Sequence, residues 1–189
     1  MLTIKERQEY LKALGLYSGA IDGVEGVNTR AGYKLLQNKL FTRARDKDGY
    51  YGSNTDKLLQ NAYNVKTYTK NFSLSEFKCD CGGKYCTGYP AVLDPQLLKN
   101  LQTMRDKYGP LTITDGLRCE QFNVAVGGAS GSRHKSGKAA DIRVNICYSG
   151  AGRKQVMAFW QTLPQQRYTY CNINGSYPNM GSSVHVDVE

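Results

Sequence analysis

The 189-residue sequence has no apolar run of about 18 residues, the length that a membrane-spanning helix needs. Its first residues also lack the basic and then apolar layout of a signal peptide. We therefore expect a protein that is made in the cytoplasm without a signal peptide and has no stable association with a membrane. Arginine-rich runs are lacking too, and basic residues are interleaved with acids, which argues against nucleic acid as a partner.

What remains is a basic chain with a formal net charge of +9 and 40% hydrophobic residues, enough for a substantial core. The positive charge is spread along the chain and favours attraction to an anionic polymer. A chain of this length holds either one domain of moderate size or a small module joined to a larger domain. We expect it to be a monomer.

Histidine is scarce, with two in the chain. His134 is followed seven residues later by Asp141, and His185 lies in a Ser-Val-His-Val-Asp-Val stretch near the end. Two histidines and one carboxylate form the ligand set of a hydrolytic zinc site, in which three protein ligands leave the fourth position to water. The alternative is that both histidines are ordinary polar residues at a strand edge.

Alternating polar and apolar residues predict that two of these side chains lie on strands. Residues 141–146 and 184–189 both alternate strictly, so each predicts a strand with one apolar face toward the core. If the two strands share a sheet, Asp141 and His185 emerge on the same side. His134 can join them from the preceding loop, because Gly137 lets the backbone turn tightly.

The spacing of these residues resembles the zinc D-Ala-D-Ala carboxypeptidase family of peptidoglycan peptidases. The matching residues are Ser132-x-His134-x-x-Gly137-x-Ala139-x-Asp141, His185 in Val-His-Val-Asp and, upstream, Asp115-Gly116-Leu117-Arg118, Asn123, Gly127-Gly128 and Ser130. The resemblance covers residues 70 to 189. It implies a mixed domain with a central antiparallel sheet, and one zinc ion bound by His134, Asp141 and His185.

The same resemblance implies how substrate is held. It directs Arg118 at the substrate carbonyl, although this residue could instead be a surface arginine paired with Asp115 or Glu120. Ser132 and Asn123 belong to the matched motifs, and we expect both to contact substrate. The loop before the last strand often carries an aromatic residue in the family, so we expect Tyr177 to contact substrate as well.

A general base is also needed to take the proton of the attacking water. Many relatives carry a glutamate three residues before the last zinc histidine, but this chain has Ser182 there, which cannot serve. Asp187 shares a strand face with His185 and is our candidate for the catalytic base. The alternative is that Asp187 is an acceptor that orients a zinc histidine.

An eight-residue repeat marks the N-terminal part. The pattern Asp-Gly-x-x-Gly-x-Asn-Thr occurs at residues 22–29 and 48–55, and each copy predicts a tight turn followed by a helix cap. With helices expected at 4–14, 30–40 and 56–64, residues 1–66 resemble the peptidoglycan-binding modules of cell-wall hydrolases. The alternative is a helical packing module without a ligand. Its candidate wall-binding residues, which could equally be half-buried supports, are Tyr17, Tyr50 and Tyr51.

Three cysteines lie within eight residues, at Cys79, Cys81 and Cys86, and could form part of a structural zinc site. None of the other cysteines lies in a paired spacing, so a packing role is favoured over a second metal. Disulfides are not expected in the cytoplasm. The cysteines that could supply a fourth ligand are Cys119, Cys147 and Cys171.

Residues 71–189 form the expected second domain. Its clearest helix begins at Asp94-Pro95 and ends before Gly109-Pro110, followed by a strand at 111–114 and helices at 119–126 and 152–163. The predicted fold class is α+β. It combines a small three-helix module at 1–66 with a mixed catalytic domain at 71–189, in which helices flank a central antiparallel sheet.

These features together predict a zinc-dependent peptidase of bacterial peptidoglycan that uses zinc-activated water to hydrolyse a stem-peptide or cross-link bond at D-Ala. A wall-binding module joined to a wall peptidase without a signal peptide resembles a bacteriophage endolysin, held in the host cytoplasm before lysis. Two alternatives stay open. One is cleavage between L-Ala and D-Glu, and the other is a wall-binding protein whose peptidase domain is inactive.

Overall fold

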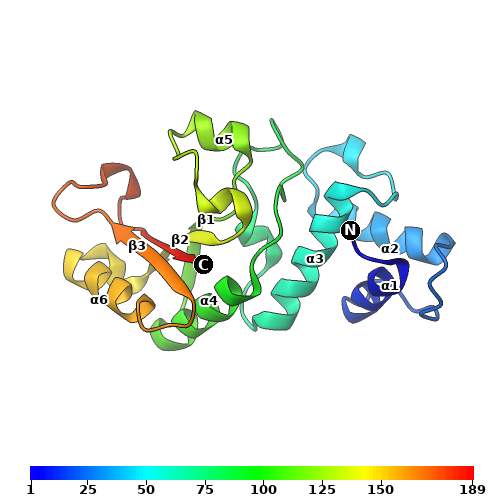
Figure 1. Cartoon of the computed structure of the whole chain (residues 1–189), viewed down its shortest axis with the longest axis horizontal. Coiled ribbons are helices and arrows are strands. Elements are labelled where there is room, and N and C mark those ends of the chain that lie inside the picture. The colour runs from blue at the N-terminus through cyan, green and yellow to red at the C-terminus, as the bar shows by residue number, and fades with distance from the viewer.

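The computed structural model describes all 189 residues, and its secondary structure confirms the α+β class (Figure 1). Three helices form the N-terminal segment, and a four-stranded sheet with three more helices forms the rest. The helices are α1 (Ile4–Ala13), α2 (Val27–Leu40), α3 (Ser53–Tyr68), α4 (Pro95–Tyr108), α5 (Glu120–Ala125) and α6 (Gly150–Trp160). The strands are β1 (Leu111–Asp115), β2 (Ala139–Val144), β3 (Gln166–Cys171) and β4 (Val184–Val188). Short 3-10 helices are η1 (Ala44–Asp46), η2 (Leu74–Phe77), η3 (Arg133–Ser136), η4 (Asn145–Tyr148) and η5 (Pro178–Met180).

One strand of the sheet is unexpected from the sequence. β3 pairs with β4, yet its residues carry no clean alternation of polar and apolar side chains. Conversely, the strand expected at residues 141–146 ends at Val144, because η4 follows at once and leads into α6. Edge strands such as β3 bury less apolar surface than central ones, and the period-two signal weakens accordingly.

The sheet is antiparallel throughout, with strand order β1-β2-β4-β3. Helices α4 and α6 pack against it, and Trp160 of α6 donates its indole N–H to the carbonyl of Asp187 at 3.3 Å. The other face carries polar side chains. The residues of the two central strands that belong to the main apolar core are Ala140, Ile142, Val144, Val184, Val186 and Val188.

A single row of residues crosses the polar face from one edge of the sheet to the other. Asp115 of β1 is paired with Asp141 of β2, which is paired with His185 of β4, which is paired with Tyr170 of β3. Residues paired across antiparallel strands lie on the same face and have Cβ atoms about 5 Å apart. The register of the sheet therefore gathers two acids, a histidine and a tyrosine at one place.

In the N-terminal segment, each copy of the repeat wraps around a buried glutamine from the preceding helix. Gln8 of α1 donates to Asp22 at 2.8 Å and accepts a hydrogen bond from the N–H of Gly23 at 2.9 Å. Gln37 of α2 makes the same two bonds in the second copy: it donates to Asp48 at 3.1 Å and accepts from the N–H of Gly49 at 2.7 Å. Both amides are fully buried, so each turn is held from inside the module.

The helix caps in the repeats differ from the prediction. α2 and α3 begin after Gly26 and Gly52, and neither helix has a side-chain cap bond. The repeat threonines instead face the buried glutamines. Thr55 accepts from Gln37 at 3.0 Å and donates to the carbonyl of Tyr50 at 3.1 Å.

α3 connects the two segments of the molecule. It packs against α4, and Asn61 both donates to the carbonyl of Ala91 at 2.8 Å and accepts from the N–H of Leu93 at 2.6 Å. Apolar packing runs without a break from the N-terminal helices to the sheet. α3 extends to Tyr68, so the residues between the two expected domains, 67–70, are partly helical. No helix combines the length and apolar character needed to cross a membrane.

Candidate metal centre and cavity

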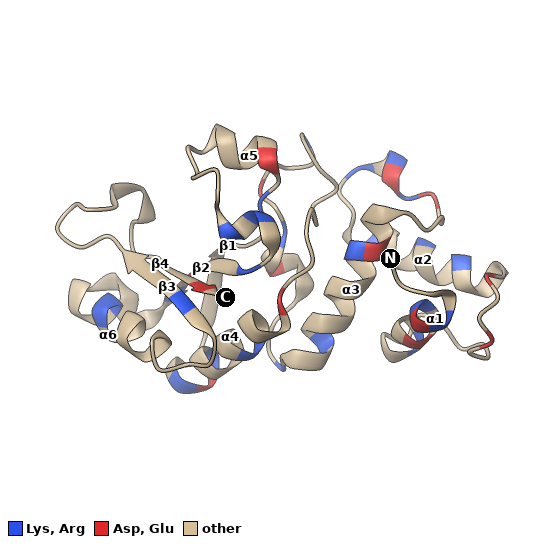
Figure 2. Ribbon diagram, in the orientation of Figure 1, with Lys and Arg blue, Asp and Glu red and all other residues tan.

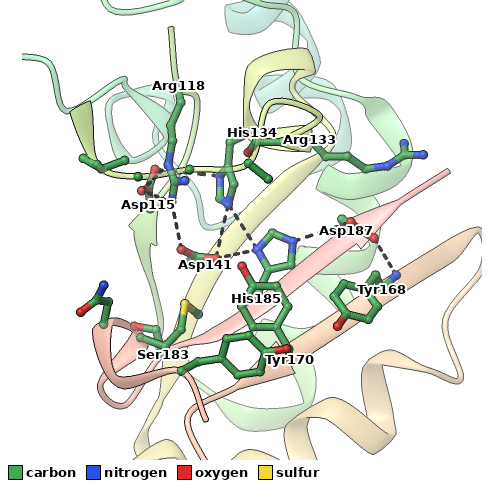
Figure 3. Close-up of a pocket in the computed structure, with 18 of the residues that line it drawn as sticks. Asp115, Arg118, Arg133, His134, Asp141, Tyr168, Tyr170, Ser183, His185 and Asp187 are labelled. Carbon is green, nitrogen blue, oxygen red and sulfur yellow. Dashed lines mark hydrogen bonds and ion pairs between the residues drawn. The ribbon is translucent and has the colours of Figure 1, made fainter. Parts of the chain in front are cut away.

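A cavity of about 700 Å³ lies over the polar face of the sheet (Figure 3). All four strands contribute to its lining, together with the loop before β2 and the loop between β3 and β4. His134, Asp141 and His185 form one side of its floor. These three candidate ligands lie up to 51 positions apart in the chain.

His134 lies in η3, just before β2, and its ring is oriented by the backbone. Nδ1 lies 2.7 Å from the carbonyl oxygen of Gly116, an acceptor, so this nitrogen carries the proton. Nε2 is then left with a lone pair that points at Asp141 and His185. Gly116 permits this arrangement because a Cβ there would lie 2.6 Å from the backbone of Phe77.

The three candidate ligand atoms converge on one point. His134 Nε2 lies 3.3 Å from His185 Nδ1 and 3.4 Å from Asp141 Oδ1, and the last two atoms are 2.8 Å apart. A tetrahedral zinc ion with bonds of about 2.0–2.1 Å holds its ligand atoms about 3.3 Å apart. The two-nitrogen, one-oxygen donor set and its spacing thus fit a zinc ion with one open position toward the cavity.

The electrostatics of the cluster favour an ionised Asp141. Burial alone would raise the pKa of Asp141, but hydrogen bonds and charge from His134 and His185 lower that pKa below its usual range. Burial also opposes protonation of His185, while Asp141 and Asp187 raise its pKa. Asp141 is therefore ionised, which is the form that binds a metal.

Asp187 lies on the opposite edge of the His185 ring from Asp141. Its Oδ2 is 3.7 Å from His185 Nε2, and its Oδ1 accepts the backbone N–H of Tyr168 at 2.6 Å. The side chain is buried, yet it lines the cavity. The carboxylate is thus held by β3 while facing the nitrogen of His185 that points away from Asp141.

Arg118 follows β1 and lines the cavity beside the cluster. Its Nε lies 2.7 Å from Asp115 Oδ2, and its Nη2 lies 3.4 Å from Asp141 Oδ2. Burial opposes the guanidinium charge, but Asp115 and Asp141 raise the pKa of Arg118 above its ordinary value. The arginine therefore pairs with Asp115, as one interpretation of the sequence expected, and also lies at the cavity.

An aromatic wall stands next to His185 and is not evident from the histidine motifs. Tyr170 stacks on the His185 ring, with ring centroids 4.5 Å apart and planes inclined by 24° (Figure 3). The ring centroid of Tyr177 lies 4.6 Å from that of Tyr170. The spacing of Tyr168 and Tyr170 was the available signal, since residues two apart on a strand share a face. Because the sequence did not predict β3, the face shared by these two tyrosines could not be assigned to a position in the sheet.

The three residues expected to contact substrate are separated by the structure. Ser132 and Tyr177 line the cavity, whereas Asn123 does not. Asn123 is fully buried, and its amide donates to the carbonyls of Gly128 at 3.1 Å and Ala129 at 2.9 Å. Asn123 therefore holds the glycine-rich loop that borders the cavity and does not contact the cavity itself, because both donors of its amide bind carbonyls of that loop.

The candidate wall-binding tyrosines also differ from one another. Tyr17 donates to the carbonyl of Ala20 at 2.6 Å, and Tyr51 is bonded to Asp56, so both hydroxyls have partners inside the module. Tyr50 is 61% exposed and borders a small hollow beside the second repeat. Of the three, Tyr50 offers the largest free surface.

Comparisons with known proteins agree with this geometry. Residues 70–187 match the model of the family described as Peptidase M15. The chain is also 30% identical over 173 residues to the zinc D-Ala-D-Ala carboxypeptidase of Streptomyces albus G, an alignment that covers 88% of this chain. The chain spans 64% of the length of that relative. Because the alignment is longer than the family match, it extends into the N-terminal helices.

Proposed function

The chain belongs to the peptidase M15 family, and on this premise we propose that it is a zinc metallopeptidase that hydrolyses bacterial peptidoglycan at a D-Ala bond. The observation that carries the proposal is the convergence of three buried ligand atoms, 2.8 to 3.4 Å apart, at the floor of the cavity. The similarity to a zinc D-Ala-D-Ala carboxypeptidase supports the choice of bond.

His134, Asp141 and His185 would hold one zinc ion. When bound, zinc lowers the pKa of a coordinated water to about 7 and polarises a carbonyl as a Lewis acid. The chain prepares the ligands for this role through its own hydrogen bonds. The carbonyl of Gly116 fixes the tautomer of His134, and partners of this kind orient metal-binding histidines.

Arg118 would position and stabilise the substrate carbonyl. A guanidinium has five N–H donors, and the contacts with Asp115 and Asp141 go through Nε and Nη2. Nη1 is therefore the end that remains for a substrate oxygen. A fixed cation in a poorly hydrated cavity stabilises the negative charge that develops on that oxygen during hydrolysis.

Asp187 would act by orienting His185. A histidine that binds metal through Nδ1 carries its proton on Nε2, and Asp187 Oδ2 lies 3.7 Å from that nitrogen. The carboxylate itself is held by the Tyr168 N–H. Its position behind the ring, on the far side from the ligand atom Nδ1, supports this role over that of a base for the attacking water.

The N-terminal helices, residues 1–66, would serve as a wall-binding module for the peptidase domain at 71–189. Lysines and arginines occur on both parts of the chain and are mixed with acids (Figure 2). A net charge of +9 favours association with an anionic wall. A wall-binding module paired with a wall peptidase is the arrangement of a bacteriophage endolysin, and we propose that role.

Tyr50 is the residue on which to test wall binding. We expect Tyr50→Ala to reduce the fraction of protein that sediments with purified cell walls several-fold, because a stacking platform is lost. Tyr148→Ala is the matched control, since Tyr148 is 71% exposed but lies outside the N-terminal module. Equal sedimentation of the two variants would argue for a packing module without a ligand.

The activity is tested by mass spectrometry of purified peptidoglycan after incubation with the zinc-loaded protein. We expect new termini at D-Ala, either release of terminal D-Ala or cleavage of a cross-link. His134→Ala is the control that should yield no product. Products cut between L-Ala and D-Glu would replace the proposed bond with the alternative one. A folded, zinc-loaded protein that binds walls but yields no product would be a wall-binding protein with an inactive peptidase domain.

A further inference from the structure

Four of the six cysteines gather outside the cavity. Cys79, Cys81 and Cys86 lie on the loop that follows η2, and Cys119 is the residue that precedes α5. The four Sγ atoms all lie within 4.8 Å of one another. Cys79, Cys81 and Cys119 are buried and Cys86 is half-buried. Three ligands from one loop are thus completed by a fourth that comes from 33 residues further along the chain.

The spacing of these sulfur atoms suits a shared metal ion. Zinc binds thiolate sulfur at about 2.3 Å, and a tetrahedron of that size places its sulfur atoms about 3.8 Å apart. The Sγ atoms of Cys81 and Cys86 are 3.5 Å apart. A disulfide would need about 2.05 Å and would join the thiols only in pairs. All four thiols are free in this structure.

The backbone around the cluster supplies hydrogen bonds to sulfur. The N–H of Cys119 points at Cys79 Sγ at 3.4 Å, and the N–H of Gly88 points at Cys86 Sγ at 3.4 Å. Hydrogen bonds of this kind stabilise the negative charge of metal-bound thiolates. Gly82 and Gly83 both have positive φ, +62° and +85°, and turn the loop so that its cysteines face the same point.

The two remaining cysteines show that burial alone does not explain the cluster. Cys147 and Cys171 are as buried as the others but belong to the apolar core under the sheet. Neither forms part of a group of ligands, and the Sγ of Cys171 contacts Met157 Sδ at 3.3 Å. These two behave as small apolar residues, which is the ordinary role of a buried cysteine.

We propose that Cys79, Cys81, Cys86 and Cys119 bind a second, structural zinc ion as a closed tetrathiolate site. Four protein ligands leave no position for water, so this ion takes no part in hydrolysis. It ties the loop to the segment that carries Arg118, directly before Cys119.

The surrounding contacts indicate what the second ion would stabilise. The N–H of Leu117 donates to the carbonyl of Phe77 at 2.9 Å, so the loop already runs beside the arginine segment. On its other side the loop meets the N-terminal segment, where the N–H of Thr42 donates to the carbonyl of Thr87 at 3.4 Å. The closed site therefore lies where the N-terminal segment, the loop and the wall of the cavity meet.

The test is a count of metal ions in variants purified under reducing conditions. We expect about two zinc ions per wild-type chain by elemental mass spectrometry and one in the double variant His134→Ala/His185→Ala. Cobalt loaded into that double variant should give sulfur-to-cobalt charge-transfer absorption and the intense visible bands of a tetrahedral thiolate site. Adding Cys81→Ala and Cys86→Ala should remove the metal and the bands, whereas adding Cys171→Ala should leave both.

The count in the double histidine variant decides the proposal even if the cysteine variants fail to fold. A folded double variant that holds no stoichiometric zinc after zinc loading would overturn the site. So would an iron–sulfur absorption spectrum, or disulfides among the four cysteines in protein kept reduced. Zinc in that variant would support the site independently of peptidase activity.

Discussion

The two candidate metal centres differ in how each one is built and in what it leaves free. The His134, Asp141 and His185 centre draws its ligands from the polar face of a sheet and opens onto a cavity of about 700 Å³. The cysteine cluster draws its ligands from a loop and a helix start, and three of its four cysteines are buried. One arrangement keeps a position for reactants, and the other uses every position to hold the chain together.

The two centres are connected through Arg118. We call the His134, Asp141 and His185 centre the open centre and the cysteine cluster the closed centre. The Arg118 guanidinium contacts Asp141 of the open centre at 3.4 Å, and the next residue, Cys119, belongs to the closed centre. A change at the closed centre should therefore reach the open centre through the position of this arginine. The predictions below test that division of roles, beginning with the largest expected effect.

Removing a ligand from the open centre should distinguish the two centres most strongly. We expect His134→Ala to slow peptidoglycan hydrolysis by about a thousandfold or more, because a catalytic metal contributes several kcal/mol of transition-state stabilisation. The zinc of the closed centre should remain. Product release and zinc per chain are the two measurements. A variant with full activity and unchanged zinc content would show that the proposed ligand set is wrong.

Replacing the connecting arginine should reduce the rate without removing either ion. We expect Arg118→Ala to lower kcat by about a hundred- to thousandfold, since loss of one donor to a developing oxyanion costs about 3 kcal/mol. Arg118→Lys should recover part of this loss, because it keeps the charge but not the forked geometry. Arg167→Ala is the control, as Arg167 also lines the cavity. Equal rates for the two alanine variants would exclude the proposed role.

Asp187→Asn should weaken the open centre and leave the closed one intact. We expect zinc affinity at the histidine site to fall by about ten- to a hundredfold, the usual effect of losing an orienting partner. Affinity is measured by competition with a chromogenic chelator, and kcat is measured at saturating zinc. If kcat collapsed while zinc affinity stayed at the wild-type value, Asp187 would be the general base instead.

The smallest expected effect on catalysis comes from the closed centre itself. We expect Cys86→Ala to reduce kcat less than Arg118→Ala does, and to lower the unfolding temperature, by about 2–4 °C for each kcal/mol lost in a chain of this size. A strong chelator should lower the unfolding temperature of the double histidine variant, but not after Cys86→Ala is added. Thermal denaturation with and without chelator measures this. The same chelator response with and without Cys86→Ala would contradict a structural ion at the cysteines.

Local patterns allowed part of this structure to be predicted. Helix α4 begins at Pro95 after an aspartate cap and ends before Gly109, as its start and stop signals indicate. The alternation around Asp141 and His185 predicted a shared face, and the structure places these residues opposite each other in β2 and β4. Such signals depend only on residues that are close together in the chain, so they can be recognised in the sequence alone.

Other features could not be predicted, because they depend on contacts between distant parts of the chain. Asn123 lies in a matched motif, but its burial against the Gly128 and Ala129 carbonyls is visible only in the folded loop. Gln8 and Gln37 look like ordinary helix residues until the repeat turns close around them. Tyr170 gained a location only when β3 paired with β4.

By itself the sequence determined the chemical types of the candidate ligands, the faces on which Asp141 and His185 lie, and the two repeat turns. The tertiary structure alone decided that Asp115, Asp141, His185 and Tyr170 form one row, and that Cys119 completes a group with the loop cysteines. The physical reason is that side-chain alternation is a property of the local backbone. Strand register and loop closure instead arise from packing between segments that are not neighbours in the chain, such as Cys79 with Cys119, 40 residues apart, and Asp141 with His185, 44 residues apart.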